Sequence, residues 1–254
     1  MNTQGVLYIA TGEKYIHAAI RSARSVLKYC PDLPIHLFAD WQSYNFPFNT
    51  TPFPFTTVES VLNPHRRSKV DYISQTPFER TLYLDTDTLL NANINSIFQI
   101  LERFDLALAH AQHRTSAFRL DGWRIKIDQA FPQYNTGVIL YRKTPATIRL
   151  LEEWRTCYHA NSMRPDQPIL RELIWLSSLR VATLPPEYNI RFIKYPLLLW
   201  SKSEAQAKIF HLKALHMGWL RWLNRKRPLA KAARMLGLGW LIDFIKNMIN
   251  GRRL

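Results

Sequence analysis

The sequence predicts an α/β protein with a central mixed, mainly parallel sheet flanked by helices, followed by a basic helical tail. Short apolar runs alternate with segments of helical apolar spacing along most of the 254 residues, a pattern typical of strands joined by helices. Hydrophobic residues make up 47% of the chain, which is sufficient for a substantial core. The net charge of +15 indicates a polyanionic partner.

The N-terminal residues predict a strand–helix–strand unit. We expect a buried strand at residues 6–10, a helix at 15–30 and a second strand at 35–39. The helix is predicted from apolar residues at helical spacing, and Pro31 ends it. Elements of these lengths form a right-handed unit with parallel strands.

Three residues directly follow these two strands: Thr11, Gly12 and Asp40. Ligands bind at the carboxyl ends of the strands in parallel sheets, so we expect all three to contribute to a nucleotide site. Gly12 would allow the backbone to approach the ligand closely. The alternative is ordinary turn chemistry at the strand ends, with Asp40 capping a turn.

The rest of the chain continues the same alternation. Residues 46–55 are rich in Pro and Phe and predict a loop or an edge segment. A basic turn lies inside one expected helix, at residues 65–69. Helices are expected at 60–74, 94–104, 144–158 and 165–176, and strands at 81–84, 106–111 and 137–141.

An acidic pair, Asp85 and Asp87, comes directly after the apolar strand at residues 81–84. Residues i and i+2 of an extended segment point to the same side, so both carboxylates face one place. Such like charges repel unless a cation lies between them. A hard divalent ion, Mn²⁺ or Mg²⁺, with open positions for phosphate oxygens suits this arrangement. The alternative is that the pair solvates a turn.

Residues 82–90 resemble the acidic strand of GT-A fold glycosyltransferases, particularly family 8 and related nucleotide-diphospho-sugar transferases. The resemblance covers residues 6 to about 216 and implies a GT-A (Rossmann-like) fold. It also implies metal-dependent transfer of a sugar from a UDP- or GDP-sugar to a glycan or lipid-linked acceptor, as in polysaccharide biosynthesis. Other segments are similar to family segments in the expected order: residues 7–12, 67–73, 134–140, 166–170 and 208–211.

The resemblance implies three metal ligands: Asp85, Asp87 and His211. Asp85 would also contact the ribose, and His211 would bind as a neutral imidazole. His216 is a rival ligand because it lies close to His211 in the sequence. The family's phosphate-clamping pattern is not cleanly reproduced at residues 213–218.

Two basic and two pocket residues also follow from the resemblance. Arg67 and Lys69 are candidates for neutralising the diphosphate or contacting the base, and the alternative is a solvated helix face. Asn135 and Gly137 are expected in the donor or acceptor pocket, where an amide can bind sugar hydroxyls.

Asp166 and Gln167 resemble the family's downstream pair that holds the transferred sugar or the acceptor. Asp166 at the start of a helix also fits a purely structural role. Inversion of the anomeric centre would need a general base, for which Asp166 is the best-placed carboxylate. The resemblance favours retention, in which the leaving phosphate assists.

Residues 219–254 are predicted as a basic tail after a transferase domain of residues 1–218. The tail carries nine Lys or Arg against one Asp. Tryptophans and cations on short amphipathic helices suit an anionic bilayer surface. The alternative is a helix packed on the core. The sequence has no zinc spacing, RNP-type stretch or helix-turn-helix pattern, so nucleic acid is not the expected partner.

The cysteines and the N-terminus bear on the compartment. Cys30 and Cys157 lie outside any metal or redox spacing. They could form a pair, but we expect them as buried free thiols in a reducing compartment. The N-terminus lacks the features of a secretion signal, and no apolar run approaches the roughly 20 residues of a membrane span. We expect a cytoplasmic protein, soluble or peripheral on the inner face of a membrane.

Two other classes of protein share parts of this pattern. A nucleotidyltransferase has a similar sheet and acidic pair, but it normally carries a glycine-rich basic loop after the first strand. Residues 10–14 contain a single glycine, which disfavours that class. The remaining alternative is a non-catalytic membrane- or nucleic-acid-binding module on a degenerate transferase fold.

Overall fold

The computed structural model describes residues 3–44, 54–111, 123–160, 166–191, 207–212 and 216. The chain divides into two compact units, Met1–His211 and Leu212–Leu254. The fold described below belongs to the first unit. The basic tail at residues 219–254 and the Pro- and Phe-rich segment up to residue 53 lie outside the described residues.

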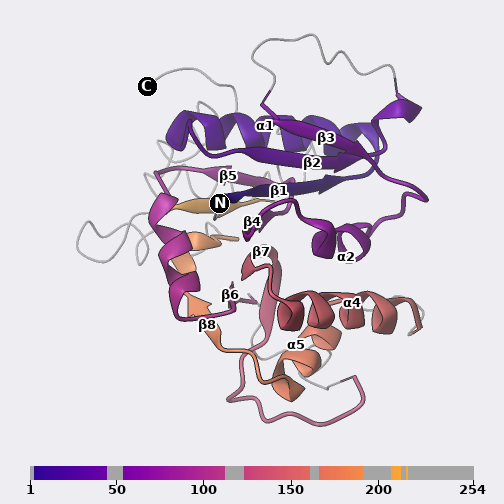
Figure 1. Ribbon diagram of the computed structural model, residues 1–254, viewed down its shortest axis with the longest axis vertical. Coiled ribbons are helices and arrows are strands. Elements are labelled where there is room, and N and C mark those ends of the chain that lie inside the picture. The colour runs from indigo at the N-terminus through magenta and orange to yellow at the C-terminus, as the bar shows by residue number, and fades with distance from the viewer. Residues whose placement is uncertain are drawn as a thin grey trace, which may run out of the picture. The chain divides into compact units, whose positions relative to one another are not determined.

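The first unit is built on a mixed, mainly parallel sheet, as the sequence predicts (Figure 1). Its seven strands run in the order β3-β2-β1-β4-β7-β6-β8. β7 is antiparallel to both of its neighbours, and the other pairings are parallel. A second, antiparallel pair is formed by β5 and β9. The strands are β1 Gln4–Ala10, β2 Ile35–Ala39, β3 Thr57–Ser60, β4 Arg80–Leu84, β5 Thr88–Leu90, β6 Leu106–His110, β7 Tyr134–Arg142, β8 Val181–Leu184 and β9 Ile209–His211.

Helices lie between these strands where the apolar spacing predicts them. None in the described part of the chain is long and apolar enough to cross a membrane. The helices are α1 Glu13–Tyr29, α2 Lys69–Tyr72, α4 Pro145–Ala160 and α5 Asp166–Leu176, with 3₁₀ helices η1 Trp41–Ser43, η2 Ile73–Gln75, η3 Asn95–Glu102 and η4 Pro186–Tyr188.

The core consists of two apolar clusters on opposite faces of the sheet. Alternate residues of β1 point to opposite faces, so Val6 packs in the cluster with α1 and η3, whereas Leu7 packs in the cluster with α4 and α5. Figure 1 shows α4 and α5 together, apart from α1. Cys30 belongs to the first cluster and Cys157 to the second. Both are buried free thiols, as expected.

Two expected helices take a different form. The prediction of one helix over residues 60–74 is wrong, because β3 ends at Ser60 and the α-helix is confined to Lys69–Tyr72. The Ser68 hydroxyl accepts from the His65 amide and donates to its carbonyl, which competes with helical bonding. Residues 95–102 form a 3₁₀ helix rather than an α-helix. Both helix types bury residues three or four apart, so the apolar spacing does not separate them.

Candidate active site

The acidic pair occupies a tight turn between two strands. β4 ends at Leu84, and the amide of Asp85 donates to the carbonyl of Gly137 on β7 over 2.8 Å. The hydroxyl of Thr88 donates to the Asp85 carbonyl over 2.8 Å, and β5 begins at Thr88. Both ends of the turn are therefore held by strand pairing. Asp87 is buried, and Asp85 is partly exposed.

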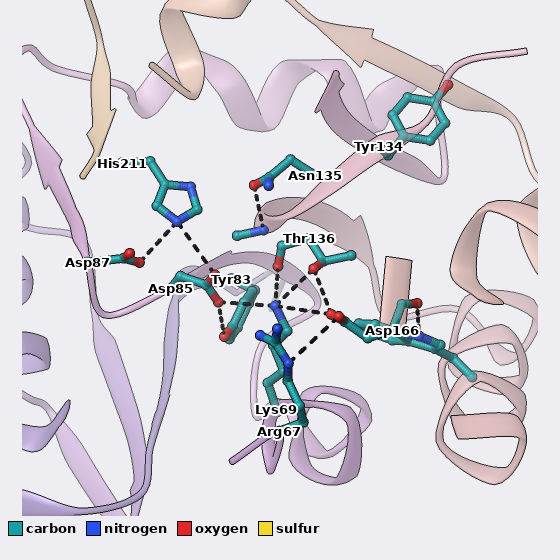
Figure 2. Close-up of polar contacts among 12 residues, drawn as sticks. Arg67, Lys69, Tyr83, Asp85, Asp87, Tyr134, Asn135, Thr136, Asp166 and His211 are labelled. Atoms are coloured by element: carbon teal, nitrogen blue, oxygen red, sulfur yellow. Dashed lines mark hydrogen bonds and ion pairs between the residues drawn. The ribbon is translucent and has the colours of Figure 1, made fainter. Parts of the chain in front are cut away.

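His211 reaches the acidic pair through the small second sheet. β9 pairs with β5 so that His211 lies opposite Thr88, the residue after Asp87. Its Nε2 atom is 3.0 Å from Asp87 Oδ1 and 3.6 Å from Asp85 Oδ2 (Figure 2). The ligand atoms of the three residues all lie within 4.8 Å of one another. Two carboxylates and one imidazole in this space fit a divalent cation such as Mn²⁺.

A chain of hydrogen bonds sets the tautomer of His211. The amide of Gly137 can only donate, so the atom 3.0 Å away on Asn135 is its carbonyl oxygen. The Asn189 amide nitrogen donates to the same oxygen over 2.9 Å, which turns the Asn189 oxygen toward His211 Nδ1 at 2.8 Å. Nδ1 therefore carries a proton, and Nε2, which faces the carboxylates, is the nitrogen whose lone pair can bind a cation.

Arg191 competes for the same lone pair. Its Nη1 atom is 2.9 Å from His211 Nε2 and 3.2 Å from Nδ1. A guanidinium can only donate, so it can bond to Nε2 only while that nitrogen carries no proton. A cation bound by His211 would replace this contact.

Glycine is the only residue type that fits at position 137. A Cβ atom there would lie 2.0 Å from His211 Cε1 and 2.7 Å from Asp85 Oδ2. Both distances are far below van der Waals contact, so any side chain would push apart the imidazole and the carboxylate. The backbone of β7 thus forms a wall of the site directly behind these two groups.

Lys69 joins the acidic pair to the start of α5. Its buried ammonium lies 3.2 Å from Asp85 Oδ1 and donates to the carbonyl and hydroxyl oxygens of Thr136 at 2.9 Å each. The Thr136 hydroxyl in turn donates to Asp166 Oδ2 over 3.0 Å, and Lys69 is 3.7 Å from the same oxygen (Figure 2). One cation is therefore shared by two carboxylates from different elements.

The charges around Asp85 favour its ionised form. Burial acts against ionisation, but Lys69 and His211 lower the pKa of the Asp85 carboxyl below its ordinary value. Burial and Asp85 raise the pKa of Tyr83, so its phenol stays protonated and donates to Asp85 Oδ1 over 2.7 Å. With Lys69 and Tyr83 on Oδ1, the other oxygen, Oδ2, faces His211.

Arg67 adds a second cation to the network. Its Nε atom is 3.7 Å from Asp166 Oδ1. Burial acts against its charge, but Asp166 and Asp85 raise the pKa of the guanidinium. Its side chain is more exposed than that of Lys69, so it can reach a ligand from the solvent side.

Thr11, Gly12 and Asp40 form a group of their own at the carboxyl ends of β1 and β2. The Gly12 amide donates to both carboxylate oxygens of Asp40, at 2.8 and 3.0 Å. Gly12 has a φ of 96°, a conformation that favours glycine. The hydroxyl of Thr11 donates to the carbonyl of His65 over 3.0 Å, which links this loop to the segment carrying Arg67.

The sequence-predicted residues are thus distributed over two groups. Gln167 follows Asp166 in the first turn of α5. His216, the rival ligand, belongs to the second unit and is not placed relative to this site. The residues joined by the network around the acidic pair are Arg67, Lys69, Asp85, Asp87, Asn135, Gly137, Asp166 and His211.

Four further residues of the network were not predicted. Tyr83 had a usable signal, since it lies two residues before Asp85 on the same side of the strand. Thr136 lies inside the quoted segment at residues 134–140. Asn189 and Arg191 carry no local signal, because only the approach of their segment to β9 brings them to His211.

Comparisons with known proteins agree with this geometry. A family model described as nucleotide-diphospho-sugar transferase matches residues 80–227, more than half of the chain. No curated protein sequence matches. Among solved structures, galactosyltransferase LgtC in complex with donor and acceptor sugar analogues is similar over 82% of this chain and 87% of its own, with a TM-score of 0.58 and 13% identity.

A second similar structure is the apo form of glycosyltransferase GlyE from Streptococcus pneumoniae TIGR4. The match covers 83% of this chain and 54% of GlyE, with a TM-score of 0.58 and 17% identity. At such identities the two structures establish a common fold and nothing about substrates.

Proposed function

Because the chain belongs to the nucleotide-diphospho-sugar transferase family and has a GT-A glycosyltransferase fold, we propose that it is a cation-dependent enzyme. It transfers a sugar from a UDP- or GDP-sugar to a glycan or lipid-linked acceptor. The observation that carries this proposal is the convergence of ligand atoms from Asp85, Asp87 and His211 within 4.8 Å. Mn²⁺ or Mg²⁺ held there would neutralise the diphosphate leaving group.

Each carboxylate of the pair has a separate task. Asp87, buried against His211, serves only the cation. Asp85 has Oδ1 held by Lys69 and Tyr83, so Oδ2 remains for the cation and the ribose. Because Nδ1 of His211 is already committed to Asn189, its Nε2 atom is the ligand.

The cations and the loops bind the rest of the donor. Arg67 and Lys69 provide positive charge next to the acidic pair, where the diphosphate develops negative charge. Thr11, Gly12 and Asp40 form the nucleotide cradle. Support comes from Gly12, where an added Cβ would meet, among the described residues, only Tyr15 at 3.6 Å, so these residues leave the backbone open to a ligand.

The sugar end of the donor lies at Asn135, Gly137, Asp166 and Gln167, and transfer proceeds with retention. A general base needs a carboxylate oxygen that can accept a proton. Oδ2 of Asp166 already accepts from Thr136, and both oxygens face cations. These contacts suit a residue that positions the sugar, which agrees with a mechanism that needs no base of this type. The anomeric configuration of the product, measured by NMR, decides between retention and inversion.

The main experiment measures nucleoside diphosphate release from a panel of UDP- and GDP-sugars with and without Mn²⁺. We expect turnover with one donor class only when the metal is present, and its loss in Asp87→Asn. Asp32→Asn is the matched control. It neutralises an exposed carboxylate in a turn and should behave like the parent protein.

Thermal melting with the same panel tests the non-catalytic alternative. The enzyme hypothesis is supported if a nucleoside diphosphate raises the melting temperature of the parent protein only when Mn²⁺ is present and does not raise that of Asp87→Asn. A flat response of the folded parent protein across all nucleotides and both metals would overturn the proposal and favour a binding module.

The basic tail at residues 219–254 brings the enzyme to an anionic membrane surface that carries its acceptor. Support comes from the nine Lys or Arg in the tail against one Asp, together with its interspersed tryptophans. Co-sedimentation with vesicles containing anionic lipid should be strong for the full chain and weak for residues 1–218. Equal binding by both would contradict this role.

A further inference from the structure

A second group of metal-ligating side chains lies outside the proposed catalytic site. It consists of His65 in the turn before α2, Asp71 on α2 and His159 in the last turn of α4. One ligand atom from each residue lies within 4.8 Å of the other two.

Asp71 lies between the two imidazoles. His65 Nε2 contacts Asp71 Oδ2, and His159 Nε2 is 2.6 Å from Asp71 Oδ1. The ring centroids of His65 and His159 are 5.5 Å apart, with an angle of 69° between the planes, and both Nε2 atoms contact the same carboxylate. The His159 side chain is 44% exposed, which gives an ion access from solvent.

The local charges select the kind of cation. The cluster has a single carboxylate, and Arg66 and Arg67 directly follow His65. A hard ion such as Mg²⁺, bound mainly by carboxylate charge, is disfavoured there. Two imidazoles and one carboxylate suit Zn²⁺ and similar transition-metal ions, leaving a fourth position for water. His159 also lies at the C-terminal end of α4, whose dipole favours a cation.

We propose that His65, Asp71 and His159 bind a transition-metal cation of the Zn²⁺ class and that this ion ties α2 to the end of α4. Tetrahedral ligands of Zn²⁺ are separated by roughly 3.3 Å, from metal–ligand distances of about 2.0–2.1 Å. Asp71 is closer than that to both nitrogens, so ion entry moves these side chains apart by less than about 1 Å. The exposed imidazole of His159 can accommodate this shift.

Ion binding also changes the tautomer of His65. The amide of Arg67 donates to His65 Nδ1 over 3.2 Å, so the neutral ring carries its proton on Nε2, directed at Asp71. Coordination through Nε2 places the proton on Nδ1 and opens this long hydrogen bond. The backbone of Arg67, two residues before Lys69, therefore senses whether the ion is bound.

The test is a Zn²⁺ titration of the metal-stripped full chain against a chromophoric zinc indicator. Three proteins are compared: the parent, His159→Ala and the control His17→Ala, which removes another exposed histidine near a carboxylate. We expect His159→Ala to lose one equivalent of Zn²⁺, with affinity weakened by more than about 100-fold, and His17→Ala to keep it. Circular dichroism establishes that His159→Ala is folded. Equal stoichiometry and affinity in all three proteins would overturn the proposal.

Imidazole ¹⁵N NMR provides an independent readout. Zn²⁺ should shift the resonances of His65 and His159 in the parent protein. Neither resonance should shift in Asp71→Asn. The same shifts as in the parent are expected in Asp87→Asn, which lacks the proposed catalytic cation site. The outcome is therefore separate from that of the proposed transfer reaction. Shifts confined to His211 would show that zinc enters the acidic pair alone, which would also overturn the second site.

Discussion

The two histidine–aspartate clusters of this protein differ in burial, charge and origin. The cluster of Asp85, Asp87 and His211 is held between strands, and its His211 side chain is 1% exposed. The cluster of His65, Asp71 and His159 joins a turn and two helix segments near the surface.

Their hydrogen-bond partners differ as well. Asn189 accepts a hydrogen bond from His211 Nδ1, which turns Nε2 toward the carboxylates. The amide of Arg67 does the reverse at His65. His211 therefore already carries the Nδ1 proton that suits metal binding through Nε2, and only the Arg191 contact has to be displaced. His65 has to move its proton from Nε2 to Nδ1 before it can bind an ion in the same way.

The largest expected contrast is between His211→Ala and His159→Ala in donor turnover. We expect His211→Ala to lower kcat/KM by about 1,000-fold, because metal charge stabilisation is worth several kcal/mol. We expect His159→Ala to stay within about threefold of the parent, since its side chain contacts His65, Asp71 and Tyr158 and, among the described residues, no group of the proposed site. Steady-state kinetics at saturating Mn²⁺ measures both. Similar losses in the two variants would erase the functional distinction between the clusters.

A methyl group in the wall of the buried cluster should be the next most damaging change. Gly137→Ala places Cβ 2.0 Å from His211 Cε1. We expect the free energy of unfolding to fall by about 1–3 kcal/mol and Mn²⁺ binding to be lost. Gly12→Ala is the control. Its backbone has a φ of 96° and a ψ of 139°, a conformation that L side chains rarely adopt, so the variant should cost about 1–3 kcal/mol and keep Mn²⁺ binding. Urea unfolding and Mn²⁺ titration separate the two effects. Full Mn²⁺ affinity in Gly137→Ala would contradict the proposed site.

Removing the partner of His211 Nδ1 tests preorganisation directly. Asn189→Ala should weaken Mn²⁺ binding by about 10- to 100-fold, the usual cost of losing such a partner. Zn²⁺ binding at the surface cluster should not change. Calorimetric titration with each metal gives both values. Unchanged Mn²⁺ affinity would mean that the strand pairing alone orients the imidazole.

The smallest predicted effect has the opposite sign. Arg191 donates to the Nε2 atom that the cation needs, so Arg191→Ala should strengthen Mn²⁺ binding by about three- to tenfold, the worth of one such hydrogen bond. The measurement is made without nucleotide, so that any contact of Arg191 with the diphosphate does not contribute. Weaker Mn²⁺ binding in this variant would show that Arg191 supports the ion site instead of competing for it.

Features that depend on neighbouring residues could be predicted from the sequence. The α/β alternation, the mainly parallel sheet and most helices follow from apolar spacing. Asp85 and Asp87 point to one side because the period of an extended segment is two. The helix expected at residues 60–74 failed for an equally local reason: the side chain of Ser68 competes with the backbone of His65.

Strand pairing and helix packing bring distant groups together, and of these contacts only that of His211 with Asp85 and Asp87 was expected from the family resemblance. Pairing of β5 with β9 sets His211 opposite Thr88, and packing of α4 on the α2 segment brings His159 to Asp71 across 88 residues. Asn189 and Arg191 reach His211 only through the bridge between Ile190 and Phe210. No local pattern encodes these contacts, because they arise from strand register and from burial of apolar faces summed over the whole fold.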